Sequence, residues 1–180
     1  MKKKLEHLKD CAMQGVICFV LLLAINGCSQ TDDVISIFTG KKWKLTYIAT
    51  EGSHKMFNFW GEDKDGTLFA ASMALLKADN NFVLTFEGAN LNGNVTGTVG
   101  GRGVLATLGA DSRWSVSEGS RNITLSVKQA GNEQDVLAKA FMIGVQNSFR
   151  YEGDNDNLYL YYHSGQNVMF MAFKPQKSNP

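Results

Sequence analysis

The chain has 180 residues and a formal net charge of +1, because lysine and arginine are almost balanced by aspartate and glutamate. Nucleic-acid binding needs a basic excess to neutralise phosphates, so this composition argues against nucleic acid as a partner. The three cysteines, Cys11, Cys18 and Cys28, all lie near the N-terminus. The rest of the chain therefore offers no thiol for a disulfide, a zinc site or nucleophilic catalysis, and we expect no cofactor there.

The first 28 residues have the pattern of an export signal. A basic run at residues 1–4 precedes ten apolar residues at 16–25. A bilayer span takes ~20 residues, whereas the apolar segment of a signal peptide has roughly 7–15. The sequence Ile-Asn-Gly-Cys at 25–28 resembles the lipobox of lipoprotein signal peptides. We predict a cleaved signal peptide over residues 1–27 and lipidation of Cys28; the alternative is a transmembrane anchor.

Lipidation would make the membrane the first partner of this protein. The resemblance implies three acyl chains on Cys28, which hold permanently because each buried methylene contributes ~0.8 kcal/mol. Ser29, not an acidic residue, follows the cysteine. By resemblance to Gram-negative sorting rules, this implies an outer-membrane lipoprotein that faces the periplasm or is exposed at the surface. Asp32 and Asp33 loosely resemble the acidic tract of surface lipoproteins in Bacteroidetes, or belong to a solvated tether over residues 28–39.

Five segments after the tether alternate between apolar and polar residues, at 43–49, 82–87, 95–99, 114–116 and 122–128. A period of two indicates antiparallel strands that bury one face. On the first strand, the alternation predicts a single buried face made of Trp43, Leu45, Tyr47 and Ala49.

Two segments have helical period, residues 67–77 and 133–146. Asn132 is a suitable N-cap for the second helix, with Asp135 three residues later as in a capping box. Closing strands at 158–163 and 167–174 flank a hairpin around Gly165. The last strand is apolar on both faces, so we expect it to be covered on both sides.

The order of these segments resembles the META-domain family and related lipocalin-like lipoproteins of Bacteroidetes. The resemblance is carried by the stretches at 40–46, 81–86, 92–97, 123–127, 135–145, 149–151, 157–160 and 168–173. It implies a mainly β (β+α) fold, a small antiparallel β-barrel of about seven to eight strands with one or two helices over residues 40–175, followed by a tail at 176–180. It also implies adjacent first and last strands, so that Trp43 packs against Met169 or Met171. It brings no catalytic residues.

Three other patterns have plainer interpretations than ligand chemistry. The glycine stretch at 97–103 lacks the Lys-Ser/Thr of a P-loop and suits the turns and bulges of a sheet. The acidic stretches at 63–66 and 154–157 lack the spacing of a calcium loop and suit solvated turns. His54 and His163 are far apart and have no supporting cysteine, so we predict no metal site.

Aromatic residues are the candidate contacts for a ligand or a protein partner. Phe57 and Trp60 fall in a predicted loop ahead of the first helix, and Tyr159 and Tyr161 lie on a closing strand. In a closed barrel, inward aromatics line a cavity or fill the core, and loop aromatics at the mouth can contact a ligand. Trp60 is the first candidate, and we expect its removal to cost little stability.

Three functions are compatible with these patterns. The leading hypothesis is a non-catalytic envelope lipoprotein whose barrel binds a small apolar ligand or an envelope protein. The second is a structural or stress-related envelope component with a packed barrel, and the third is an enzyme such as a hydrolase. An open apolar cavity would favour the first, a filled barrel with an apolar surface patch the second, and a cleft with clustered His, Asp and Ser the third.

The lipobox makes one prediction that needs no structure. Replacing Cys28 with alanine removes the thiol that would carry the acyl chains, so Cys28→Ala should leave the membrane fraction or accumulate unprocessed. Fractionation of cells that express either chain measures this. A membrane fraction that is unchanged in Cys28→Ala contradicts the lipoprotein prediction.

Overall fold

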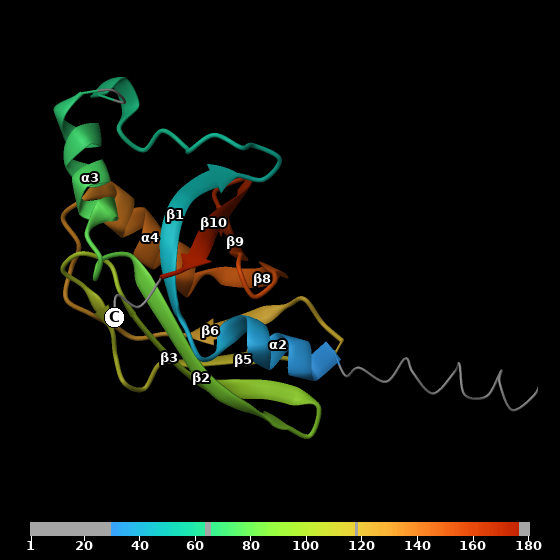
Figure 1. Cartoon of the computed structure of the whole chain (residues 1–180). Coiled ribbons are helices and arrows are strands. Elements are labelled where there is room, and N and C mark those ends of the chain that lie inside the picture. Colours follow the sequence, from blue (N-terminus) through green and yellow to red (C-terminus); the bar gives the residue numbers. More distant parts are fainter. Residues whose placement is uncertain (1–29, 64–65, 118, 177–180) are drawn as a thin grey trace, which may run out of the picture. The chain divides into compact units, whose positions relative to one another are not determined.

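The computed structural model of the protein describes residues 30–63, 66–117 and 119–176 (Figure 1). In these ranges the elements are, in chain order, α2 (Gln30–Phe38), β1 (Lys42–Thr50), the short 3-10 helix η1 (Gly61–Asp63), α3 (Thr67–Lys77), β2 (Val83–Leu91), β3 (Asn94–Arg102), β4 (Thr107–Leu108), β5 (Arg113–Val116), β6 (Ile123–Ser126), β7 (Gln129–Ala130), α4 (Val136–Gln146), β8 (Ser148–Gly153), β9 (Leu158–Ser164) and β10 (Asn167–Pro175). None of the helices in these ranges combines the length and hydropathy of a bilayer span. The predicted signal peptide and Cys28 lie outside the described residues.

The ten strands form one antiparallel sheet. Eight run in the order β6–β5–β3–β2–β1–β10–β9–β8, and the short strands β4 and β7 pair beside β3. Strands β6 and β8 are the two edges of the sheet. Between these edges, the described residues form one isolated bridge, from Asn122 to Arg150, and no continuous ladder. The prediction of a mainly β, antiparallel fold is confirmed. The predicted closed barrel of seven to eight strands is not shown, because the ten-stranded sheet stays open.

The first and last strands pair along most of their lengths, as expected from the sequence. Trp43 is fully buried, and its indole N–H donates to the carbonyl oxygen of Phe38 at 3.2 Å. In the register between the two strands, Trp43 lies opposite Pro175. Met171 and Met169 lie farther along β10, opposite Ile48 and Thr50, so neither is the expected cross-strand partner of Trp43.

A bulge in β1 changes which side chains of the strand face the main core. The register against β10 shifts between Leu45 and Tyr47. Leu45 and Ile48 belong to the main core, whereas Tyr47 and Ala49 pack into a separate cluster with residues of β9 and β10. A one-residue insertion exchanges the faces of all later side chains. The single buried face predicted for residues 43–49 is therefore wrong beyond Leu45.

The tether expected over residues 28–39 is a helix from Gln30 onwards. Phe38, at the end of α2, is fully buried. Its ring centroid lies 4.8–5.0 Å from the ring centroids of Phe86, Trp114 and Tyr151, which come from β2, β5 and β8. In Figure 1, α2 lies against this part of the sheet. The fold thus begins about ten residues before the predicted boundary at residue 40, and one end of its interior is filled by aromatic rings.

Helix α4 covers another part of the sheet's inner face. Its N-cap is Asp135, whose carboxylate accepts a hydrogen bond from the amide of Ala138 at 2.9 Å, so the predicted cap at Asn132 is wrong. Phe141 is fully buried and meets the rings of Phe82 and Phe173 at centroid distances of 5.7 and 6.2 Å. These rings occupy the space that an internal ligand cavity would need.

Trp60 links the loop before α3 to both helices. Its side chain is only 8 % exposed, and its indole N–H donates to the hydroxyl of Ser72 on α3 at 2.9 Å. The Ser72 hydroxyl donates in turn to Asp135, the N-cap of α4. The structure therefore places Trp60 in the core and not at an open mouth.

This placement reverses the expectation for Trp60. Truncating a buried tryptophan costs about 3–5 kcal/mol, so Trp60→Ala should lower the free energy of unfolding by an amount similar to Trp43→Ala. Trp60→Phe keeps an aromatic ring and loses the hydrogen bond to Ser72, so its loss should be smaller, about 1–2 kcal/mol. Urea denaturation measures all three variants. A free energy of unfolding for Trp60→Ala within about 1 kcal/mol of the wild-type value would contradict the buried position of Trp60.

Candidate functional site

Three surface hollows on the described residues are similar in size, with volumes of about 200, 240 and 250 Å³. Volume therefore does not separate them, and the side chains that line each hollow decide which is a candidate site. Ligand sites combine apolar or aromatic walls with a few polar groups that fix orientation.

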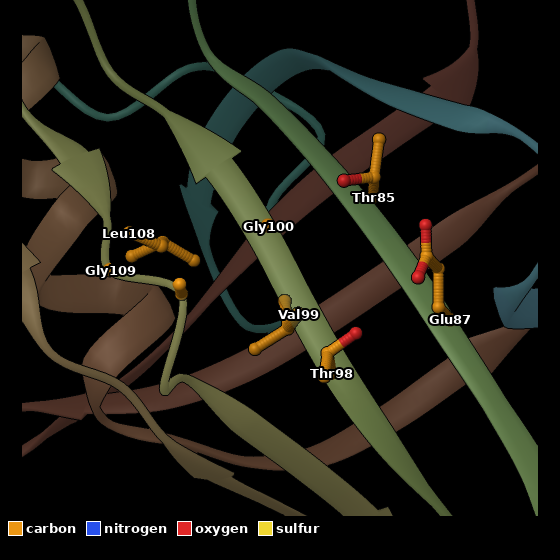
Figure 2. A pocket seen from close by; sticks show the side chains of 8 residues that line it. Thr85, Glu87, Thr98, Val99, Gly100, Leu108 and Gly109 are labelled. Atoms are coloured by element: carbon orange, nitrogen blue, oxygen red, sulfur yellow. The ribbon is translucent and has the colours of Figure 1, made fainter.

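The smallest hollow lies on β2 and β3 beside β4 (Figure 2). Thr85 stands directly opposite Gly100, and Glu87 directly opposite Thr98. A Cβ at Gly100 would lie 2.7 Å from the hydroxyl oxygen of Thr85. The Thr85 hydroxyl therefore already occupies the position of a side chain at Gly100. No aromatic ring lines this hollow.

The largest hollow lies beside α4 and is lined in part by Glu133 and Lys139. The Glu133 carboxylate is already occupied by the chain itself. It accepts hydrogen bonds from the amides of Val104, Leu105 and Ala106 at 2.7–3.2 Å. Glu133 therefore holds the loop after β3 in place, because its oxygens satisfy three backbone donors that would otherwise be buried without partners.

The third hollow is the candidate site, and we call it the aromatic groove. It lies on the face of β1, β10 and β9 opposite the main core. Its lining consists of four aromatic residues, Tyr47, Tyr159, Tyr161 and Phe170, and four residues that add polar or small groups, Gly52, Ser53, His54 and Glu152.

Strand pairing positions the four rings. Phe170 on β10 is the centre, directly opposite Tyr161 on β9. The ring centroid of Phe170 lies 5.8 Å from Tyr47, 5.9 Å from Tyr159 and 5.7 Å from Tyr161. Its contacts with Tyr47 and Tyr159 are edge-on, a favourable arrangement for aromatic pairs. Small side chains, Ala49 and Ala172, complete the cluster and leave space above it.

Charged side chains surround Tyr161. Its hydroxyl donates to Oε2 of Glu152 at 3.0 Å. The guanidinium carbon of Arg150 lies 3.9 Å from the centroid of the Tyr161 ring. Arg150 also pairs with Glu51 and reaches Oε1 of Glu152 at 3.9 Å.

Burial raises the pKa values of two of the groove's phenols, Tyr161 and Tyr47. Burial raises the pKa of Tyr161 to about 12, and the hydrogen bond to Glu152 contributes to this increase. Burial also raises the pKa of Tyr47, with a further contribution from nearby Tyr159. At physiological pH these side chains therefore offer neutral rings and hydroxyl groups, not negative charge.

Two of the four aromatic contacts expected from the sequence meet in the groove, Tyr159 and Tyr161. Phe57 is 39 % exposed and packs against the ring of Phe59 at 4.9 Å, outside the groove, and Trp60 is in the core. Sequence reasoning missed Tyr47 and Phe170. The bulge conceals the face of Tyr47, and Phe170 lies in a strand that is apolar throughout.

The structure also locates the histidines and the acidic turns. His54 lines the groove, whereas His163 stacks on Phe149 at 4.5 Å between ring centroids. Asp154 accepts hydrogen bonds from the amides of Asp156 and Asn157, as in a self-capped turn. Across the described ranges, no three His, Cys, Asp or Glu side chains gather as a metal site requires.

The pKa of Tyr161 can be tested by alkaline titration. Glu152→Gln removes the negative charge near the phenol, so the pKa of Tyr161 should fall from about 12 towards the ordinary value near 10. Tyr162, whose pKa burial alone raises to about 12, provides an internal reference. Tyrosinate absorbance of the wild type, Glu152→Gln and Glu152→Gln/Tyr161→Phe measures the change, and identical curves for the first two contradict it.

The same raised pKa has a consequence for stability. Because the folded-state pKa of Tyr161 lies above its unfolded value, the contribution of this group to stability is fully present below about pH 10. It is lost as the pH rises towards 12.

Comparisons with known proteins address the fold and the family. A family model described as a domain of unknown function, DUF4847, matches residues 29–175. The crystal structure of a DUF4847 family protein from Bacteroides vulgatus ATCC 8482 is similar, with a TM-score of 0.55 and 17 % sequence identity. The similarity covers 81 % of this chain and 99 % of that one, and at this identity it shows the fold alone. No curated protein matches the chain.

These findings overturn the resemblance drawn from the order of strands and helices. The family model matches DUF4847 over residues 29–175, so the assignment to the META-domain family is wrong. The family model extends over the helix α2 that the sequence patterns concealed, and it ends at Pro175, the last residue of β10. The chain belongs to the DUF4847 family.

Proposed function

We propose that this protein is a non-catalytic lipoprotein of the cell envelope, anchored through Cys28, and that the aromatic groove binds a small ligand. One observation carries the proposal: four aromatic rings gather around a hollow of about 240 Å³ on the sheet face opposite the main core. The solvated face of an antiparallel sheet normally carries polar residues. An apolar cluster there is typical of a binding site.

The polar groups of the groove support binding rather than catalysis. The Ser53 hydroxyl accepts a hydrogen bond from the amide of Lys55 at 3.2 Å and donates to its carbonyl oxygen, so it is held by backbone. Glu152 accepts a hydrogen bond from the Tyr161 hydroxyl and lies near Arg150. These groups can orient a ligand through hydrogen bonds. A hydrolase would need a nucleophile activated by a neighbouring base.

The filled interior favours a second candidate, a structural envelope component that uses the aromatic groove as a protein interface. Aromatic rings of α2, α4 and the strands fill the space in which a lipocalin-like protein would hold its ligand. A hollow with walls on several sides suits a small molecule better than a flat partner surface. For this reason we place the small ligand first.

Native mass spectrometry of the full chain, purified in detergent from its own host, tests the proposal. The wild type should carry an additional mass that Tyr159→Leu loses. Phe57→Leu is the matched control, because it makes the same kind of change outside the groove, and it should retain the mass. A bound mass that survives in Tyr159→Leu places the ligand elsewhere. A protein instead of a small molecule in the complex supports the structural candidate.

A further inference from the structure

The chemistry of the groove narrows the class of ligand, provided that the groove is the binding site proposed above. The faces of aromatic rings carry negative potential and attract cations within about 6 Å of the ring centroid. In the aromatic groove, Phe170 forms the centre and three tyrosines surround it at centroid distances of 5.7–5.9 Å. Several rings around one hollow are the arrangement that binds quaternary ammonium groups in other proteins.

One of these rings, that of Tyr161, already makes a cation–π contact within the protein. The guanidinium of Arg150 lies over the Tyr161 ring at 3.9 Å. Among the described residues, no lysine or arginine lies over Tyr47, Tyr159 or Phe170. These three rings therefore remain without an internal cation, although they line the same hollow.

The charges beside the groove favour a cation over an anion. Two carboxylates, Glu51 and Glu152, lie next to a single guanidinium, that of Arg150. The raised pKa values of Tyr47 and Tyr161 keep the phenols uncharged at neutral pH. One negative charge is left without an internal counterpart in this group, and it lies at the margin of the rings.

From these observations we infer that the aromatic groove binds an organic cation with a trimethylammonium head, such as choline or a choline-bearing headgroup. A trimethylammonium group suits the groove better than a primary ammonium does. The primary group is strongly hydrated and loses that hydration on apolar rings, whereas the methyl groups contact the rings directly. Glu152 would balance the charge of the bound cation from the margin of the groove.

The test compares choline with dimethylbutanol, the neutral analogue in which carbon replaces nitrogen. Both have the same shape, so the difference in their dissociation constants measures the effect of charge alone. Isothermal titration calorimetry with the detergent-solubilised full chain should show choline binding about tenfold more tightly, from a cation–π contribution of about 1–2 kcal/mol. Glycerophosphocholine in place of choline distinguishes the two sources: tighter binding assigns a lipid headgroup, and weaker binding assigns a free small molecule.

Two variants locate the effect. Glu152→Gln should weaken choline binding several-fold without changing dimethylbutanol binding, because only the charged ligand senses the carboxylate. Tyr159→Leu should weaken choline binding about tenfold, and Phe57→Leu should bind choline as the wild type does. Circular dichroism confirms that each variant is folded before its binding is compared.

The outcomes separate this inference from the proposed function. Equal affinity for choline and dimethylbutanol, or no binding of choline, overturns the cation inference. Neither of these results contradicts the binding of a different small ligand in the groove. Native mass spectrometry of the wild type and Tyr159→Leu tests that separately. Conversely, a bound mass that persists in Tyr159→Leu overturns the proposed site even if choline binds.

Discussion

The bulge in β1 is the constraint on which both the core and the aromatic groove depend. Before it, Trp43 and Leu45 face the main core, and after it Ile48 takes over that role. The extra residue turns Tyr47 and Ala49 to the opposite face, where they meet β9 and β10. Without the insertion, Tyr47 would enter the core and the groove would lose a wall. One irregularity in hydrogen bonding thus gives a single strand two buried surfaces.

The packed interior explains why the candidate groove lies on the outer face of the sheet. Phe38 of α2 and Phe141 of α4 bring rings into the inner face of the sheet from two helices, and both are fully buried. Gly144 allows α4 to approach β10 so closely that a Cβ there would lie 2.8 Å from the sulfur of Met171. A sheet packed this tightly on its inner face has no room there for a ligand, which is why we place the candidate site on the outer face.

Local patterns predicted those parts of the fold that local physics determines. The bounds of α3 agree with the helical period at residues 67–77, and the hairpin at Gly165 agrees with its turn residues. The helix α2 was missed because its polar start reads as a tether, and only contacts made by Phe38 with distant strands reveal its role. Helix α4 begins after Asp135, whose carboxylate caps the amide of Ala138 and also accepts a hydrogen bond from Ser72, which is distant in sequence.

The candidate site was partly predictable for a similar reason. The sequence places Tyr159 and Tyr161 on a closing strand and expects inward aromatics of a barrel, but both lie in the cluster outside the main core. Tyr162, which follows Tyr161, is the one that enters the core. Tyr47 needed knowledge of the bulge, which depends on pairing with β10. Trp60 was assigned to a surface loop because its hydrogen-bond partner on α3 cannot be recognised from the loop sequence alone.

Arg150 connects the aromatic groove to the edges of the sheet. Its backbone forms the isolated bridge to Asn122, and its side chain lies over Tyr161 and pairs with Glu51. A junction held by an isolated bridge separates at a lower free-energy cost than the continuous ladder between β1 and β10. If a ligand that orders Arg150 also stabilises this bridge, amide exchange along β8 slows when the ligand binds, and loosening the bridge weakens ligand binding by the same factor.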